Sequence, residues 1–430
     1  MKEHRLLHGS AWIVSGQFVS MAFQAAYFVL MGRTLGSREY GAFVGVVALV
    51  ALLTQFSSAG MEMILLRNIS RDRKSFPSTW GNALLITAFG FVLVLAAAWL
   101  IGSLTLRPQF RVLIPWIAIG DALFGKVVQL ASRAFQGAGE MSYCARLTAF
   151  VYAARAALAA ALYLYARYWG GHPDAYTWAR IYWLAPFAVS VFAFWIITSQ
   201  LGLPRFERLR LRDLSEGLSF SFSNSSISAY NDIDKTFLVS LGQTYAAGIY
   251  SAAYRVVDVA TAPLYGIYTA ATPRLFREGA RSVSHASAQS RRLLLRTIPY
   301  GLAVAAALYF GAPILPRLFG ASFQGSVAAL RWLCLLPMLR VLHYAWGTTI
   351  TASASQWNRT ATQFGAAALN LLLNCLLIPR WSWQGAAVAS LLTDGSLAIS
   401  SRFVLWWIQR REAGLHEGRR SGLVIAPSAD

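Results

Sequence analysis

Apolar stretches of about 20 residues recur along this chain, and each is long enough for a helix to cross the hydrocarbon core of a membrane. Charged residues make up only 13% of the chain, whereas a soluble domain usually carries about 25%. We therefore predict an all-α, polytopic membrane protein with twelve transmembrane helices. The predicted spans are 11–33, 41–66, 80–105, 112–136, 144–166, 177–200, 215–240, 246–272, 293–316, 324–350, 360–379 and 383–408.

Basic residues in the connections between spans set the predicted orientation. With both termini in the cytoplasm, most loop Lys and Arg residues fall on the cytoplasmic side, as the positive-inside rule requires. We predict a multi-pass protein of the bacterial inner membrane with both termini cytoplasmic. The formal net charge of +20 is spread over short loops and does not follow one exposed basic face. Nucleic acid is therefore not a predicted partner.

A hydrophilic connection at 201–214 divides the predicted spans six and six, as a parallel internal repeat would. The spacing from Gly41 to Arg67 equals that from Gly248 to Arg274, which supports such a repeat. The tail is polar, and we expect it to lack regular structure. The predicted parts are an N-terminal six-helix bundle at 1–200, a cytoplasmic linker at 201–214, a C-terminal six-helix bundle at 215–409 and a cytoplasmic tail at 410–430.

Motifs that would indicate an enzyme are missing from the sequence. It contains neither a GxSxG nucleophile elbow nor a P-loop, so ATP is not a predicted energy source within this chain. Cys144, Cys334 and Cys375 are far apart and have neither metal-ligand nor disulfide spacing. We predict a secondary transporter without a cofactor, and no metal site can be assigned with certainty from the sequence.

Polar residues inside apolar helices are costly in lipid, and they are functional candidates for that reason. In the first half of the chain they follow helical spacing, and we predict that they line a wet, cationic cavity suited to a phosphate group. The alternative is that Lys126 pairs with Asp121 and that Arg155 extends to a membrane interface. The predicted substrate-binding residues, which include one from the second half, are Lys126, Arg133, Arg155, Arg255, Gln17, Gln24 and Gln129.

A second set of polar residues lies in the later helices. Their carboxylate, amide and hydroxyl oxygens suit a small cation, so they are candidates for a coupling site for Na+ or H+. The alternatives are a buried ion-pair network in the seventh span, and asparagines that hold helices together in the eleventh. The coupling-ion candidates are Asp232, Asp234, Asn370, Asn374, Thr393 and Asp394.

Three segments resemble the O-antigen and polysaccharide flippases of the multidrug/oligosaccharidyl-lipid/polysaccharide exporter superfamily. The resemblance extends over essentially the whole chain and is most specific in the seventh and eighth spans. The segments are Gly9-Ser10-Ala11-Trp12, then Arg33-Thr34-Leu35-Gly36 through Tyr40-Gly41, and Asn231-Asp232-Ile233-Asp234-Lys235 running to Gly248-Ile249-Tyr250-Ser251-Ala252-Ala253-Tyr254-Arg255.

The resemblance implies two six-helix bundles around a V-shaped central cavity. It implies alternating access for an oligosaccharide linked to undecaprenyl pyrophosphate, moved from the inner to the outer leaflet during O-antigen, capsule or exopolysaccharide biosynthesis. It also implies that helices seven, eleven and twelve hold a coupling cation. The expected partners are this lipid-linked oligosaccharide and membrane lipid, with a polysaccharide polymerase and glycosyltransferases as further candidates.

Two other functions remain open from the sequence. One is a cation-coupled multidrug exporter of the same superfamily, although a cavity lined by arginine disfavours cationic drugs. The other is a non-transporting scaffold for a glycan-assembly complex, for which the predicted cavity would be dry. The sequence does not specify the glycan, the coupling ion or the oligomeric state.

Overall fold

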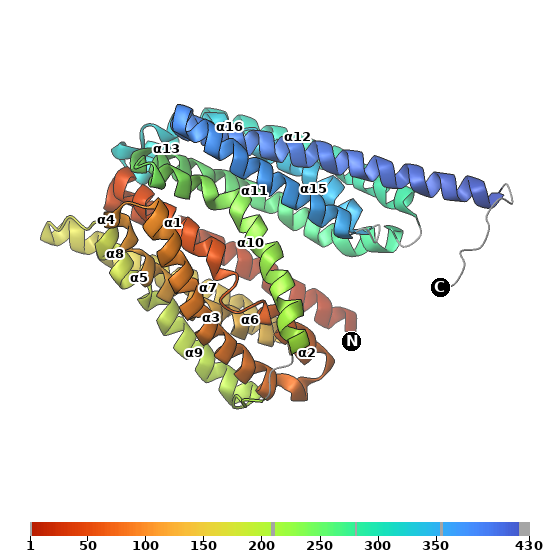
Figure 1. The fold of residues 1–430 in the computed structure, drawn as a ribbon, viewed down its shortest axis with the longest axis horizontal. Coiled ribbons are helices and arrows are strands. Elements are labelled where there is room, and N and C mark those ends of the chain that lie inside the picture. The colour runs from red at the N-terminus through yellow and green to blue at the C-terminus, as the bar shows by residue number, and fades with distance from the viewer. Residues whose placement is uncertain (1, 208–210, 280–281, 353–355, 421–430) are drawn as a thin grey trace. The chain divides into compact units, whose positions relative to one another are not determined.

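All regular elements of the described residues are helices in the computed structural model, which confirms the predicted all-α class (Figure 1). The structure describes residues 2–207, 211–279, 282–352 and 356–420. The helices are α1 (Lys2–Thr54), α2 (Met61–Arg71), α3 (Phe76–Thr105), α4 (Pro108–Arg111), α5 (Ile114–Ala118), α6 (Lys126–Gly137), α7 (Met141–Trp169), α8 (Ala175–Tyr182), α9 (Leu184–Leu201), α10 (Leu211–Ser240), α11 (Thr244–Gly279), α12 (Val283–Gly311), α13 (Ile314–Phe319), α14 (Ser326–Leu333), α15 (Leu336–Ala352) and α16 (Gln356–Arg420). Short 3-10 turns form η1 (Arg73–Ser75) and η3 (Ala321–Phe323), and a π-helical turn forms η2 (Ile119–Gly125).

Eight helical stretches of the described chain are long and apolar enough to cross a membrane, so the protein is a multi-pass membrane protein. Two of them contain a kink between two predicted spans. The α1 helix breaks at Gly36, where φ is 70°, and α16 breaks at Ser382, where φ is 53°. The α10 and α11 helices have the length but not the apolar composition, and the count of twelve spans stays a prediction.

The chain forms two compact units, which are described separately. The predicted division at 201–214 stays a prediction, and its residues 208–210 lie outside the described residues. The first unit consists of Met1–Ala252, Pro313–Val327 and Ile378–Trp383, and the second of Ala253–Ala312, Ala328–Leu377 and Gln384–Asp430.

The apolar core of the first unit lies among α2, α3, α6 and α9. Trp80 and Phe135 are fully buried there, against small residues such as Ala83 and Ala193. Small side chains let helices approach closely, and this is how helices associate where lipid removes the hydrophobic driving force. The α1 helix packs along both α7 and α10. These contacts bring α1, η2, α6 and α7 together.

Two glycines of the proposed repeat, Gly41 and Gly248, lie against each other in the first unit. A Cβ atom on Gly41 would stand 2.5 Å from the amide nitrogen of Gly248. A Cβ atom on Gly248 would stand 1.9 Å from the carbonyl oxygen of Ser37, just after the kink in α1. The backbones of α1 and α11 therefore touch at a position where only glycine fits.

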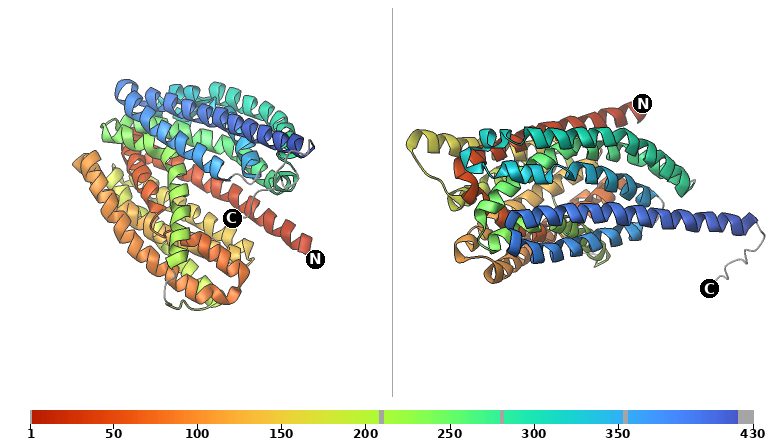
Figure 2. Two further views of the ribbon diagram at one scale, coloured as in Figure 1. Left: turned by 45° about the vertical axis from the view of Figure 1, so that its right-hand side comes forward. Right: turned by 90° about the horizontal axis from the view of Figure 1, so that it is seen from above.

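The second unit has its own apolar cluster between α11, α12 and α15, which includes Leu264, Leu294 and Val341. The Tyr268 hydroxyl lies 2.9 Å from the Thr297 hydroxyl within it. The α16 helix, blue in Figure 2, corrects one expectation, because it continues to Arg420 and the tail from 410 is not irregular over that length. Glu412 explains part of this, since it accepts a hydrogen bond from the first backbone amide of α12. Residues 421–430 lie outside the described residues.

We predict that Gly248→Ala destabilises the protein by about 1–3 kcal/mol, because the added methyl group overpacks the contact with α1. Gly266→Ala is the matched control on the same helix, where a Cβ atom meets nothing within 4 Å. Alanine favours helix over glycine there by about 1 kcal/mol. Thermal unfolding of both variants in detergent tests this. Equal stability of the two variants would contradict the close contact.

Candidate functional site

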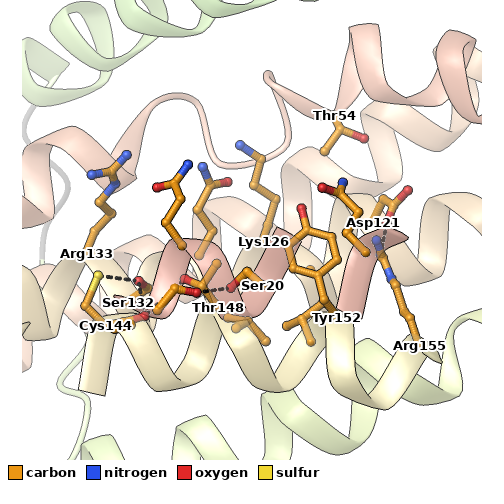
Figure 3. Close-up of a pocket in the computed structure, with 18 of the residues that line it drawn as sticks. Ser20, Thr54, Asp121, Lys126, Ser132, Arg133, Cys144, Thr148, Tyr152 and Arg155 are labelled. Atoms are coloured by element: carbon orange, nitrogen blue, oxygen red, sulfur yellow. Dashed lines mark hydrogen bonds and ion pairs between the residues drawn. The ribbon is translucent and has the colours of Figure 1, made fainter. Parts of the chain in front are cut away.

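A cavity of about 670 Å³ opens in the first unit between α1, the π-helical turn η2, α6 and α7. Six of the seven predicted substrate-binding residues line it together. Figure 3 shows Arg133 towards one end of the polar row, Lys126 further along it, and Arg155 with Asp121 at the other end. The six residues are Gln17, Gln24, Lys126, Gln129, Arg133 and Arg155.

The α6 helix supplies three of these side chains because they follow its period. Lys126, Gln129 and Arg133 lie three and four residues apart, which places them on one face. Lys126 and Arg133 are seven residues apart, or about 10 Å along the axis. The opposite face of α6 is apolar and packs into the core through Leu130 and Phe135. The apolar face of α6 is buried in the core, so the polar face is the one that borders the cavity.

Lys126 is almost completely buried, and its partner is Glu62 of α2. Its Nζ atom lies 3.3 Å from Oε1 of Glu62 and 3.4 Å from Oε1 of Gln55. The other carboxylate oxygen of Glu62 accepts a hydrogen bond of 2.5 Å from the Ser58 hydroxyl. The alternative that Lys126 pairs with Asp121 is therefore wrong, because Glu62 reaches Lys126 from a neighbouring helix.

Asp121 instead pairs with Arg155. Its Oδ1 atom lies 2.5 Å from Nη2 of Arg155, and the Tyr182 hydroxyl lies 2.9 and 3.0 Å from its two oxygens. The guanidinium group also lies over the Tyr182 ring, 4.6 Å from its centroid. Arg155 is thus held by an ion pair and a cation–π contact. The alternative that it extends to a membrane interface is wrong, since its side chain is only 14% exposed.

Arg133 differs from the other two cations of the cavity. Its Nη1 atom donates a hydrogen bond of 2.7 Å to Oε1 of Gln136, and no described carboxylate lies within ion-pairing distance. Three cations against the two carboxylates Glu62 and Asp121 leave one positive charge, and Arg133 carries it. Gln17, Gln24 and Gln129 add amide groups to the lining, and Ser20 and Thr54 add hydroxyl groups.

Arg255, the seventh predicted residue, does not line this cavity and belongs to the second unit. Its Nη1 atom lies 3.6 Å from Oδ2 of Asp258, three residues further along α11. Asp258 also pairs with Arg340 of α15, at 3.0 Å. Arg340 also lies 3.6 Å from Asp394 and donates a hydrogen bond of 2.9 Å to the Tyr254 hydroxyl.

The predicted coupling-ion residues fall in both units. In the first, Lys235 lies 2.8 Å from Asp232 and 3.4 Å from Asp234. Asp234 also accepts hydrogen bonds from the Tyr250 hydroxyl and the Lys235 amide, at 2.6 and 2.8 Å. The groups that contact this buried carboxylate are all hydrogen-bond donors. The arrangement is the ion-pair network that the sequence left open as an alternative, and it fixes α10 to α11.

In the second unit, the two asparagines lie next to the threonine of α16. The amide of Asn374 donates to Oδ1 of Asn370 at 2.8 Å, and Asn370 donates to the Thr393 hydroxyl at 3.1 Å. The Oδ1 atom of Asn374 is buried and has no hydrogen-bond partner among the described residues. Asp394 lies 3.5 Å from Nε2 of His343. Oxygen atoms therefore gather here, but a coupling role stays a prediction.

Sequence reasoning missed two tyrosines in or beside the cavity and gave Asp121 the wrong partner. Tyr152 lines it, and Tyr182 holds Asp121 from α8. Asp121 was considered only as a partner of Lys126. The signal for Asp121 and Tyr182 was present, since both are polar residues within apolar stretches, but their pairing depends on contacts between helices that spacing along one helix does not reveal.

Comparisons with known proteins agree with this architecture. A family model described as polysaccharide biosynthesis protein matches residues 6–278, which is more than half of the chain. None of the curated proteins compared with the chain matches it.

Solved structures with a similar fold are transporters of the MOP superfamily. An inward-facing multidrug resistance MATE transporter has a TM-score of 0.73 at 16% identity, covering 93% of this chain and 96% of its own. An outward-facing one has a TM-score of 0.60 at 16% identity, covering 94% and 96%. A MOP superfamily transporter from Pyrococcus furiosus Vc1, whose binding pocket of reverse polarity suggests a different function, has a TM-score of 0.61 at 15% identity, covering 94% and 96%. At these identities the likeness shows the fold.

We predict that Lys126→Met and Glu62→Gln each destabilise the protein by about 3–5 kcal/mol, because each leaves one buried charge without its partner. The double variant is expected to recover most of this loss, since no buried charge of the pair remains. Thermal unfolding of the four proteins in detergent measures the coupling. Losses that simply add in the double variant would show that the two charges do not interact.

Proposed function

We propose that this chain, which belongs to the polysaccharide biosynthesis protein family, moves a lipid-linked oligosaccharide from the inner to the outer leaflet of the bacterial inner membrane. The observation that carries the proposal is the cationic cavity of the first unit, in which Arg133 has no carboxylate partner among the described residues. A transporter of this fold needs a polar chamber for a headgroup that cannot cross lipid unaided.

Arg133 is the first contact that we assign to the phosphate portion of the substrate. A guanidinium group offers several N–H donors in a planar fork, and it binds phosphate oxygens more specifically than a point charge does. Its one side-chain hydrogen bond within the described residues, to Gln136, leaves other donors available for a ligand. An undecaprenyl pyrophosphate headgroup is the substrate that this charge and this family suit best.

The neutral polar part of the lining suits the sugar portion. Gln17, Gln24 and Gln129 present both donors and acceptors, and sugar hydroxyl groups require both. The lipid tail would stay in the bilayer while the headgroup occupies the cavity. In this scheme the headgroup enters from the cytoplasm, where we place both termini, and leaves on the other side by alternating access.

A cation gradient would supply direction if the ion binds the two access states with different affinity. The oxygen cluster of Asn370, Asn374 and Thr393 with the neighbouring Asp394 is the site that we propose for Na+ or H+. Asp234 is a weaker candidate because its contacts are all donors. A polysaccharide polymerase and glycosyltransferases are the partners that such a role implies.

Multidrug export is the rival role, since the MATE transporters share this fold. The charge of the cavity favours the anionic substrate, because three cations against two carboxylates repel a cationic drug.

We predict that Arg133→Gln lowers surface glycan about tenfold or more, because a charge-assisted hydrogen bond to phosphate contributes about 1.5–3 kcal/mol. Protein level and thermal stability are expected to stay unchanged, since the replaced side chain forms no ion pair with the described residues. The measurement is surface polysaccharide in a deletion strain that carries the variant.

Arg167→Gln is the matched control, because Arg167 is exposed at the end of α7 and does not line the cavity. Normal surface glycan is expected with it. Normal glycan with Arg133→Gln would remove the cavity from the transport path. Drug sensitivity of the deletion strain with unaltered glycan would favour the multidrug role.

A further inference from the structure

Asp121 is a carboxylate that lines the cavity in which we propose that an anionic substrate binds. The proposed function does not yet account for this negative charge. It lies in the π-helical turn η2, and its side chain is 18% exposed. Turns of this kind are rare and occur frequently at functional sites. A negative charge at this position weakens the binding of a phosphate, so its presence needs a reason.

The two carboxylates that neutralise the cavity are placed differently. Glu62 is 3% exposed and does not line the cavity, so its bond to Lys126 is sealed inside the helix bundle. Asp121 and Arg155 both line the cavity. A ligand in the cavity can therefore reach both partners of the second ion pair, but only Lys126 of the first.

Arg155 retains donor capacity beside its bond to Asp121. Its Nε atom is buried and has no hydrogen-bond partner among the described residues. A planar guanidinium group can donate two parallel hydrogen bonds to one partner, and the hydrogen bond from Arg155 to Asp121 within the described residues comes from Nη2. A phosphate oxygen that enters the cavity would meet the Arg155 guanidinium group next to a carboxylate that it can replace (Figure 3).

Tyr182 positions this carboxylate. Its hydroxyl bonds to both oxygens of Asp121, and its ring stacks under the guanidinium group of Arg155. Gly120 allows the ring to come close, because a Cβ atom there would stand 3.1 Å from Cδ1 of Tyr182. Tyr182 therefore holds a bond to Asp121 that does not depend on Arg155, and the carboxylate keeps a partner when the ion pair opens.

We infer that Asp121 is a built-in competitor for the substrate, which displaces it from Arg155 when a diphosphate group binds. The inference rests on the proposed function and deepens it, since it makes Arg155 a second phosphate contact beside Arg133. A carrier must release what it binds, and the returning carboxylate weakens the hold on the phosphate at that stage. The ion pair also excludes ligands with too little negative charge to separate it.

Inorganic pyrophosphate binding to the purified full-length protein in detergent tests the inference by calorimetry. Asp121→Asn removes the competing charge and keeps the side-chain shape, so pyrophosphate is expected to bind about tenfold more tightly. Surface glycan is expected to fall with the same variant, because release becomes slower. A purely structural carboxylate would not give tighter binding when it is neutralised.

Asp174→Asn is the matched control. Asp174 is exposed and caps α8 by accepting from the Thr177 amide, a role that asparagine also performs. The same loss of charge outside the cavity is expected to leave pyrophosphate affinity unchanged. Tyr182→Phe keeps the ring beside Arg155 but removes both hydroxyl contacts, so it is expected to tighten binding in the same direction by a smaller factor.

Unchanged or weaker pyrophosphate binding by both Asp121→Asn and Tyr182→Phe would overturn the competitor role. If Arg133→Gln still weakened binding in that experiment, the proposed function would stand and this inference alone would fail. Absence of pyrophosphate binding to the unmodified protein and to Asp121→Asn would overturn both the inference and the phosphate contact assigned to Arg133.

Discussion

A charged side chain inside a helix bundle that spans lipid needs either a partner of opposite charge or access to water. The first unit applies both solutions within one row of cations. Lys126 is buried against Glu62, Arg155 is paired with a carboxylate that lines the cavity, and Arg133 has only Gln136 as a hydrogen-bond partner among the described residues. This gradation, from fully neutralised to unneutralised, decides which cation is available to a ligand. Arg133 is therefore the cation of the cavity that is best placed to bind a phosphate group.

Ionic groups that do not line the cavity follow the same constraint. Asp234 is enclosed by the Lys235 amide and ammonium groups and by the Tyr250 hydroxyl, and it ties α10 to α11. The glycine contact between α1 and α11 stands at the start of the same helix. Buried ion pairs of this type fix helix positions and often add little net stability. The cavity pairs differ because one of them borders an open chamber.

The part of the cavity lining that comes from a single helix could be predicted from the sequence. The spacing of Lys126, Gln129 and Arg133 on α6 predicted a single polar face, and the structure places all three in one lining. Pairings between helices were not predictable, because spacing along one helix does not show that Glu62 of α2 lies beside Lys126, and the packing of α2 decides this. The π-helical turn and the continuation of α16 to Arg420 also depend on tertiary contacts.

Cys144 reports directly on whether water enters the cavity, because it is a free cysteine and is part of the lining. In a protein with Cys334→Ala and Cys375→Ala, we expect a water-soluble anionic thiol reagent to modify Cys144. The reaction is carried out in permeabilised membranes, so that the reagent reaches both faces. Added pyrophosphate should slow that reaction by occupying the same chamber. A Cys144 that reacts only after denaturation would show a dry bundle interior and would contradict the account.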